Sequence, residues 1–216
     1  MSAPALVPSP LYGLRTWSVV GPSGEERLAG PQLATPWPDS GAWLTAACAA
    51  GHAAPGPECS CGIHAWHPTR RSARRVLAIR REVPGVVEAR GAIEVHRDGF
   101  RAERARPFAV LVAPRANAAL ARRLAGAYDA ELVAVDGPGV ILAWCRERGL
   151  GLEPPVIQEL LGPAGLAEQR RRERATRLKF AAALAAIAVA VGIGLAATDD
   201  PGDRPLQGRT GEVRQP

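Results

Sequence analysis

Apolar and polar positions alternate in two stretches of the N-terminal half, which predicts β-hairpins there. Residues 14–20 (LRTWSVV) have the β-branched and aromatic content of a strand, and the Gly-Pro-Ser-Gly stretch after them predicts a turn. Residues 86–106 alternate on both sides of Asp98-Gly99, which is a preferred pair for a two-residue hairpin turn. Between these hairpins, residues 30–68 are rich in Pro, Gly and Cys and have no sustained period.

The turn predicted at Asp98-Gly99 sets a register for the second hairpin. His96 then faces Arg101, Val95 faces Ala102 and Glu94 faces Glu103. One face of the hairpin carries Ile93, Val95, Phe100 and Ala102, and the other carries Glu94, His96, Arg101 and Glu103. Two carboxylates and a histidine could perform acid–base chemistry. Ion pairs across a solvated strand pair give the same pattern, and we favour that interpretation.

From residue 108 the pattern changes to a β-α-β-α order. Strands are predicted at 108–114 and 130–135, helices at 115–128 and 137–150, and a short helix at 154–161 before the breaker Gly162-Pro163. We therefore expect one α+β domain over residues 11–161, with N-terminal hairpins and a β-α-β-α half. A Pro-rich lead, residues 1–10, precedes it and has the composition of a disordered segment.

Near the C-terminus, an apolar stretch has no polar face. Residues 180–197 carry neither a charge nor a hydrogen-bonding side chain. Residues 178–197 would rise about 30 Å as a helix, which matches the thickness of the hydrocarbon core of a bilayer. A fully buried core helix is the alternative. The pattern favours a transmembrane helix over 178–197.

The flanking charges predict the orientation of this helix. A basic juxtamembrane helix, residues 164–179, precedes it and a tail with acidic residues, 198–216, follows it. The positive-inside rule then puts the N-terminal domain in the cytoplasm and the tail outside. The first residues lack the basic start and apolar core of a secretory signal peptide. We expect a single-pass protein of the cell membrane, and small residues four apart in the helix could allow two copies to associate.

Charge is concentrated rather than spread along the chain. The formal net charge is +6, and Lys179 is the only lysine, a bias towards arginine that GC-rich codons produce. Residues 70–107 hold eleven arginines against five acidic residues. We expect the arginines of 69–81 either to form a solvated face or to contact anionic lipids of the inner leaflet. No basic motif interleaved with aromatic residues favours nucleic-acid binding.

Three of the four cysteines lie with two histidines in CAAGHAAPGPECSCGIHA, residues 48–65. A disulfide is not expected in a reducing cytoplasm. Cys48, His52, Cys59 and Cys61 could supply the four ligands of a structural zinc ion, with His64 able to replace one of them. The spacing also fits a tightly packed turn with no metal, or a reactive thiol at Cys59 or Cys61. The sequence leaves these three interpretations open.

The same segment and the second hairpin together resemble a family of uncharacterised actinobacterial proteins. The resemblance rests on His-x-Ala-Pro, Cys-x-Cys-Gly-Ile and, some forty residues later, Gly-Phe-Arg-Ala-Glu, within residues 11–114. It involves His52, Pro55, Cys59, Cys61, Gly62, Gly91, His96, Gly99, Phe100, Arg101 and Glu103. Arg90 and Val95 depart from the family pattern, which has Trp and an acidic residue there. The resemblance implies that loop and hairpin form one module, and it implies no activity.

These patterns predict a membrane-anchored protein whose cytoplasmic domain is a binding or regulatory module with a possible structural zinc site. Its expected partners are the membrane, anionic inner-leaflet lipids, and either another protein or a second copy of the chain. A membrane-tethered enzyme that uses the thiols of Cys59 and Cys61 is one alternative, and a basic nucleic-acid-binding module is another.

Overall fold

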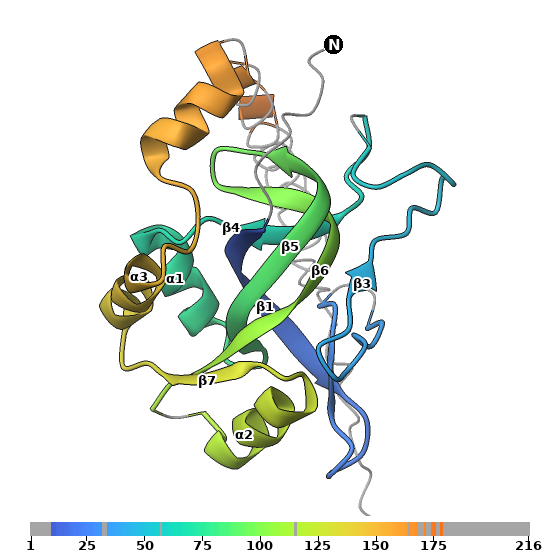
Figure 1. The fold of residues 1–216 in the computed structure, drawn as a ribbon, viewed down its shortest axis with the longest axis vertical. Coiled ribbons are helices and arrows are strands. Elements are labelled where there is room, and N and C mark those ends of the chain that lie inside the picture. The colour runs from blue at the N-terminus through green and yellow to red at the C-terminus, as the bar shows by residue number, and fades with distance from the viewer. Residues whose placement is uncertain are drawn as a thin grey trace, which may run out of the picture. The chain divides into compact units, whose positions relative to one another are not determined.

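The structure is a computed structural model that describes residues 10–31, 34–56, 58–114, 116–163, 165–167, 171, 174, 175 and 178. The chain divides into two units, Met1–Gln169 and Arg170–Pro216. The labelled strands and helices of Figure 1 belong to the first unit. In the second unit the described residues are helical.

One seven-stranded sheet organises the first unit. The strands are β1 (Leu11–Val20), β2 (Arg27–Ala29), β3 (Leu44–Thr45), β4 (Ile63–Trp66), β5 (Val83–Val95), β6 (Gly99–Val112) and β7 (Glu131–Ala134). The helices are α1 (Arg70–Ala78), α2 (Ala118–Ala127) and α3 (Pro138–Glu147), and residues 154–163 are also helical. The prediction of a mixed α+β domain is therefore confirmed.

Strand β6 is the centre of the sheet because it is long enough to pair with four others. One edge pairs with β5 along its length, and the other pairs in succession with β4, β3 and β7. Strand β1 pairs with both β5 and β4, so β1, β5, β6 and β4 close into a ring. The long strands bend strongly around this ring (Figure 1).

Two main apolar clusters hold the helices on the sheet. The first contains Trp17 and Trp37, which are 0% and 1% exposed and meet edge to face with ring centroids 5.6 Å apart. Tyr128, at the end of α2, accepts a hydrogen bond from the amide of Leu28 at 2.9 Å and so joins this helix to β2. In the second cluster, residues of α1 and α3 pack against the sheet through Val76 and Ile141.

The structure confirms both predicted hairpins and corrects the register of the second. Strands β1 and β2 pair antiparallel, as do β5 and β6. The turn residues are Arg97 and Asp98, since the amide of His96 donates to the carbonyl of Gly99 at 2.7 Å. Glu94 therefore faces Arg101, and Val95 faces Phe100. The predicted pairs, His96 with Arg101 and Glu94 with Glu103, were wrong.

Gly99 explains the difference in register. An added Cβ at Gly99 would lie 2.1 Å from the carbonyl oxygen of Ala65 in β4. This glycine is therefore needed where β6 passes β4, and it pairs with Trp66 instead of forming the turn. The pairing shifts by two residues, so each side chain stays on the face that was predicted for it. The four residues predicted on the apolar face are all buried: Ile93, Val95, Phe100 and Ala102.

The β-α-β-α half follows the predicted order. The C-terminal part of β6, then α2, β7 and α3 occupy the four predicted segments, and β7 pairs with β6 in parallel. Among the described residues no helix is both long and apolar enough to cross a bilayer. Of the predicted transmembrane helix, 178–197, only Leu178 is among the described residues. The predicted tail, 198–216, lies entirely outside them. The predicted lead, 1–10, is described only at Pro10.

Candidate metal centre

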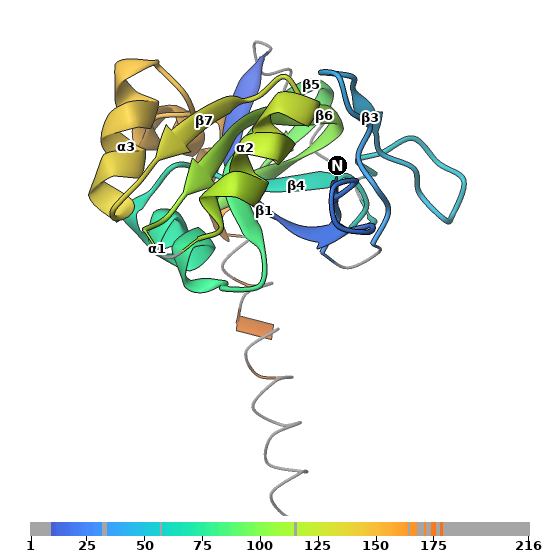
Figure 2. The ribbon, with the colours of Figure 1, turned by 90° about the horizontal axis from the view of Figure 1, so that it is seen from below.

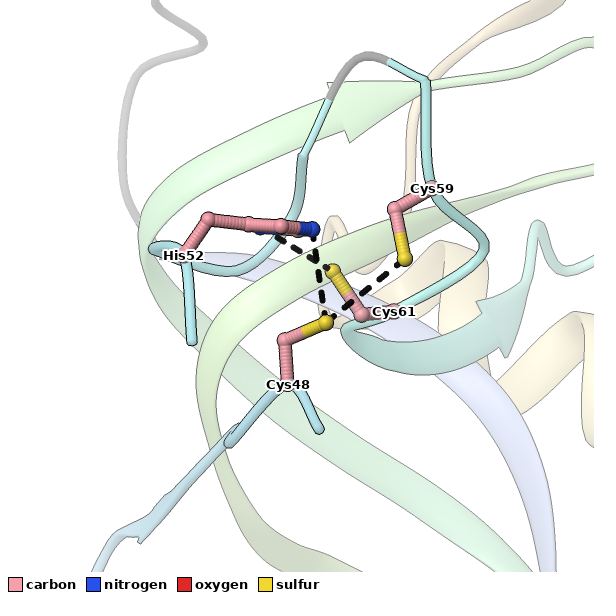
Figure 3. A group of neighbouring side chains, drawn as sticks. All are labelled: Cys48, His52, Cys59 and Cys61. Carbon is pink, nitrogen blue, oxygen red and sulfur yellow. Dashed lines mark hydrogen bonds between the residues drawn. The ribbon is translucent and has the colours of Figure 1, made fainter. Parts of the chain in front are cut away.

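The candidate metal centre lies in the irregular segment between β3 and β4. Cys48 and His52 come from its first half, and Cys59 and Cys61 come from the end that leads into β4. Their side chains point toward one another (Figure 3). One ligand atom from each residue can be chosen so that all four lie within 4.8 Å of one another. These four residues could hold a metal ion.

Individual distances approach those of a tetrahedral zinc site. The Cys48 Sγ atom lies 3.3 Å from Nε2 of His52 and 3.6 Å from Sγ of Cys59. With zinc–sulfur bonds of about 2.3 Å and zinc–nitrogen bonds of about 2.0 Å, the edges of a ligand tetrahedron are roughly 3.5–3.8 Å. Two edges therefore already have about this length, and the widest requires a contraction of about 1 Å.

The backbone selects the ring nitrogen of His52 that can bind a metal. Nδ1 donates a hydrogen bond to the carbonyl of Ala53 at 2.9 Å, which leaves the lone pair on Nε2. The same carbonyl is the main reason that the pKa of His52 is raised. Gly56 packs against the ring, because a Cβ there would lie 2.4 Å from Cε1 of His52. The imidazole is thus oriented from both sides.

Backbone amides donate hydrogen bonds to two of the cysteine sulfur atoms. The amide of Ala50 donates to Sγ of Cys48 at 3.4 Å, and that of Gly56 donates to Sγ of Cys61 at 3.3 Å. The backbone amide of Cys61, followed by the neighbouring side chains, lowers the pKa of Cys59 to about 7. Burial raises the pKa of Cys145, the fourth cysteine, to about 11. The pKa of Cys48 is raised, since the effect of the Ala50 amide, which lowers it, is outweighed by burial and the neighbouring cysteines. Thiolate character is therefore highest at Cys59.

Arg101 of β6 fastens the ligand loop to the β5–β6 hairpin. Its side chain is only 7% exposed and forms an ion pair with Glu94. The guanidinium donates to the carbonyls of Cys59, Cys61 (3.0 Å) and Gly56 (3.3 Å). Its Nε also donates to Nε2 of His96 at 3.3 Å. The buried guanidinium of Arg101 therefore holds the backbone of Cys59 and Cys61, two of the four candidate ligands.

The prediction of a solvated ion-pair face on this hairpin was wrong at Arg101. The Glu94–Arg101 ion pair does exist, but the loop covers the arginine. Glu103, predicted on the same face, accepts from the amide of Ala92 at 2.9 Å, where β5 bulges. The hairpin pattern and the Gly-Phe-Arg-Ala-Glu motif both drew attention to Arg101, but neither carried a signal for its hydrogen bonds to the loop carbonyls.

The structure separates His64 from the four candidate ligands. Its Nε2 bonds to the carbonyl of Ser60 at 2.9 Å, and His64 does not belong to the group. Gly62, Pro55 and Arg101 meet where the loop contacts the hairpin. A Cβ at Gly62, whose φ is +114°, would lie 3.2 Å from Cβ of Arg101 and 3.3 Å from Cβ of Pro55.

Comparison of the chain with family models, with curated proteins and with solved structures gives no match. The functional argument therefore depends on the geometry of the described residues.

Proposed function

We propose that this protein is a membrane-anchored binding or regulatory module whose domain is stabilised by one structural zinc ion. The observation that carries the zinc proposal is the convergence of Cys48, His52, Cys59 and Cys61 within 4.8 Å. Three thiolates and one neutral imidazole form a Cys3His ligand set, which is common in structural zinc sites. The three thiolates and the zinc ion would carry a net charge of −1.

Two observations favour a structural role over a catalytic one. Four protein ligands fill the tetrahedron, whereas a catalytic zinc keeps a position open for water or substrate. The ligands also lie between β3 and β4, strands of two and four residues, and the described residues between them form no other strand. Such a segment gains order from a cross-link that binds only the folded state.

Metal analysis of the full chain tests the proposal. We expect the protein, purified in a mild detergent without added metal, to contain about one equivalent of zinc. Cys59→Ala should lose the zinc, while Cys145→Ala, which removes the buried cysteine outside the cluster, should retain it. Less than about 0.2 equivalents of zinc in the unaltered protein would refute the structural-zinc proposal.

The lowered pKa of Cys59 supports a second candidate, a thiol-dependent reaction at this residue. At pH 7.5 a thiol with a pKa of about 7 is mostly ionised, whereas Cys145, with a pKa of about 11, is not. In protein from which a chelator has removed any bound metal, a reactive Cys59 would be alkylated well before Cys145. Equal resistance of both cysteines would remove the nucleophile that this alternative needs.

The membrane part of the proposal depends on the sequence. Residues 178–197 have the length and composition of a single span, and the basic residues before it favour a cytoplasmic domain. The resemblance to uncharacterised actinobacterial proteins supports treating loop and hairpin as one module, and it suggests no reaction.

A further inference from the structure

A second feature lies apart from the cysteine cluster, between α1 and α3. The two helices lie side by side in both ribbon views (Figures 1 and 2) and enclose an open groove of about 440 Å³. Arg70 and Arg74 of α1 and Arg146 of α3 line it. Leu142 and Ala143 add an apolar surface to the same groove.

The groove is positively charged and has no acidic residue in its lining. Among the described residues, no hydrogen bond or ion pair is formed by the side chains of Arg70, Arg74 or Arg146. Their neighbours on α1 differ. Arg71 pairs with Asp98 at 3.8 Å, and the guanidinium of Arg75 lies 5.5 Å from the centre of the Trp66 ring. The three unpaired cations therefore gather at the groove, while adjacent arginines are engaged elsewhere.

Helix α1 holds its two arginines on the groove side. Arg70 and Arg74 are four residues apart and so project from one face of the helix. The helix cannot rotate freely, because Val76 on the far side and Ala73 on the flank are fully buried in the core. The first turn is fixed as well, since Thr69 and Ser72 form a capping box and Ser72 also bonds to the carbonyl of His67.

The first turn of α3 adds a further attraction for anions. Its N-cap is Gly137, which has no side chain to satisfy the free amides of the first turn. Pro138 and Gly139 of this turn line the groove, and no atom lies within 4 Å of a Cβ built on Gly139. An anion could therefore approach the backbone there, where the helix dipole favours negative charge.

We propose that this groove binds a phosphate group, carried either by a small soluble phosphate monoester or by a lipid headgroup. A phosphate monoester has a charge of about −1.5 to −2 at neutral pH, together with three acceptor oxygens. Guanidinium groups match this geometry with paired N–H donors. This site does not depend on the metal centre.

Titration of the full chain with inorganic phosphate tests the site. In nanodiscs of neutral phosphatidylcholine, we expect saturable chemical-shift changes at the Gly139 amide and at the Nε groups of the groove arginines. The triple variant Arg70→Gln/Arg74→Gln/Arg146→Gln should weaken phosphate binding by at least about tenfold. The matched control, Arg80→Gln/Arg81→Gln/Arg122→Gln, makes the same change in charge at exposed positions outside the groove.

The control should bind phosphate as the unaltered protein does, and all three proteins should contain the same amount of zinc if they are equally folded. If the two triple variants lose phosphate affinity equally, the proposal is overturned, because the loss would then depend on net charge and not on the groove. Absence of saturable binding to the unaltered chain would overturn it too.

Nanodiscs that contain phosphatidic acid distinguish the two sources of the phosphate group. If a lipid headgroup is the ligand, phosphatidic acid should reproduce the shift at Gly139 and prevent inorganic phosphate from adding to it. If the ligand is soluble, inorganic phosphate should bind equally well in both kinds of nanodisc. A shift that phosphatidic acid produces in the groove variant as strongly as in the control would contradict a headgroup site.

Discussion

At the scale of single residues, the position of His52 depends on Gly56, which has no side chain to meet the imidazole ring. Gly56 allows the imidazole to lie against the backbone while Nδ1 bonds to Ala53. A hydrogen bond from the ring nitrogen that does not bind the metal fixes which nitrogen would face the metal. The glycine would therefore contribute to metal binding although it offers no ligand atom.

Gly56→Ala tests this contribution. The new Cβ would lie 2.4 Å from Cε1 and 2.8 Å from Nδ1 of His52, so the ring must move away from the thiols. We expect the zinc affinity, measured by competition with a chromophoric chelator, to fall by about 10–100-fold. Gly126→Ala is the matched control, because nothing lies within 4 Å of its Cβ and it sits in α2. Unchanged affinity in Gly56→Ala would show that the ring is not held in this way.

The sequence could predict the candidate ligands but not their support. Cys48, His52, Cys59 and Cys61 could be named as candidates because four Cys and His residues lie close together in the sequence, although the same spacing also fitted a packed turn or a reactive thiol. The roles of Gly56 and Arg101 could not be predicted, since both depend on where the loop folds back on itself and on the hairpin. Arg101 in particular has the local context of an exposed strand arginine, and its burial results from a contact with residues about forty positions earlier.

At the scale of elements, the β5–β6 hairpin supports the ligand loop. Arg101 enters from β6, and Glu94, directly opposite on β5, neutralises it. The planar guanidinium reaches three loop carbonyls at once, which a lysine ammonium on a flexible stem cannot do with the same geometry. An unsatisfied buried carbonyl costs about 1–3 kcal/mol, so loss of these bonds should loosen the loop.

Arg101→Lys distinguishes the hydrogen bonds that Arg101 donates to the loop carbonyls from the positive charge that it carries. We expect the zinc affinity to fall by about 10–100-fold while the far-ultraviolet circular dichroism of the holo protein is retained. Arg104→Lys makes the same exchange three residues away, on a side chain that is 47% exposed, and should leave the affinity unchanged. If both variants bind zinc as the unaltered protein does, the planar guanidinium of Arg101 is not needed to hold the loop for zinc binding.

Element types were more predictable than their pairing. Hydrophobic periodicity located the hairpins and the β-α-β-α half, because each depends on local sequence. The turn of the second hairpin was displaced by one residue, because Gly99 is needed for the close approach to Ala65, a tertiary constraint. The ring formed by β1, β5, β6 and β4 likewise depends on pairings between distant segments and has no local signature.

At the scale of the whole molecule, the predicted membrane span would set where the domain with the proposed zinc site and phosphate groove is located. If residues 178–197 anchor the chain, the phosphate groove works at high local concentrations of headgroups, whereas a free domain would meet only soluble phosphates. The zinc ion would then stabilise a domain that is held near the membrane. The location of the chain therefore decides which phosphate source the groove meets.

Arginines placed inside the apolar stretch test the span. Each arginine at the centre of a transmembrane helix costs about 2.5–3.5 kcal/mol of insertion free energy, and this alanine-rich stretch has little excess hydrophobicity to offset two of them. Ile187→Arg/Val191→Arg should therefore release the chain from membranes into the carbonate-soluble fraction, with its zinc still bound. Thr210→Arg/Val213→Arg adds the same charge to the predicted tail and should leave the chain in the membrane pellet. A chain that stays in the pellet with both arginines in the stretch would owe its attachment to another part of the molecule, and the basic groove would then be the first region to test.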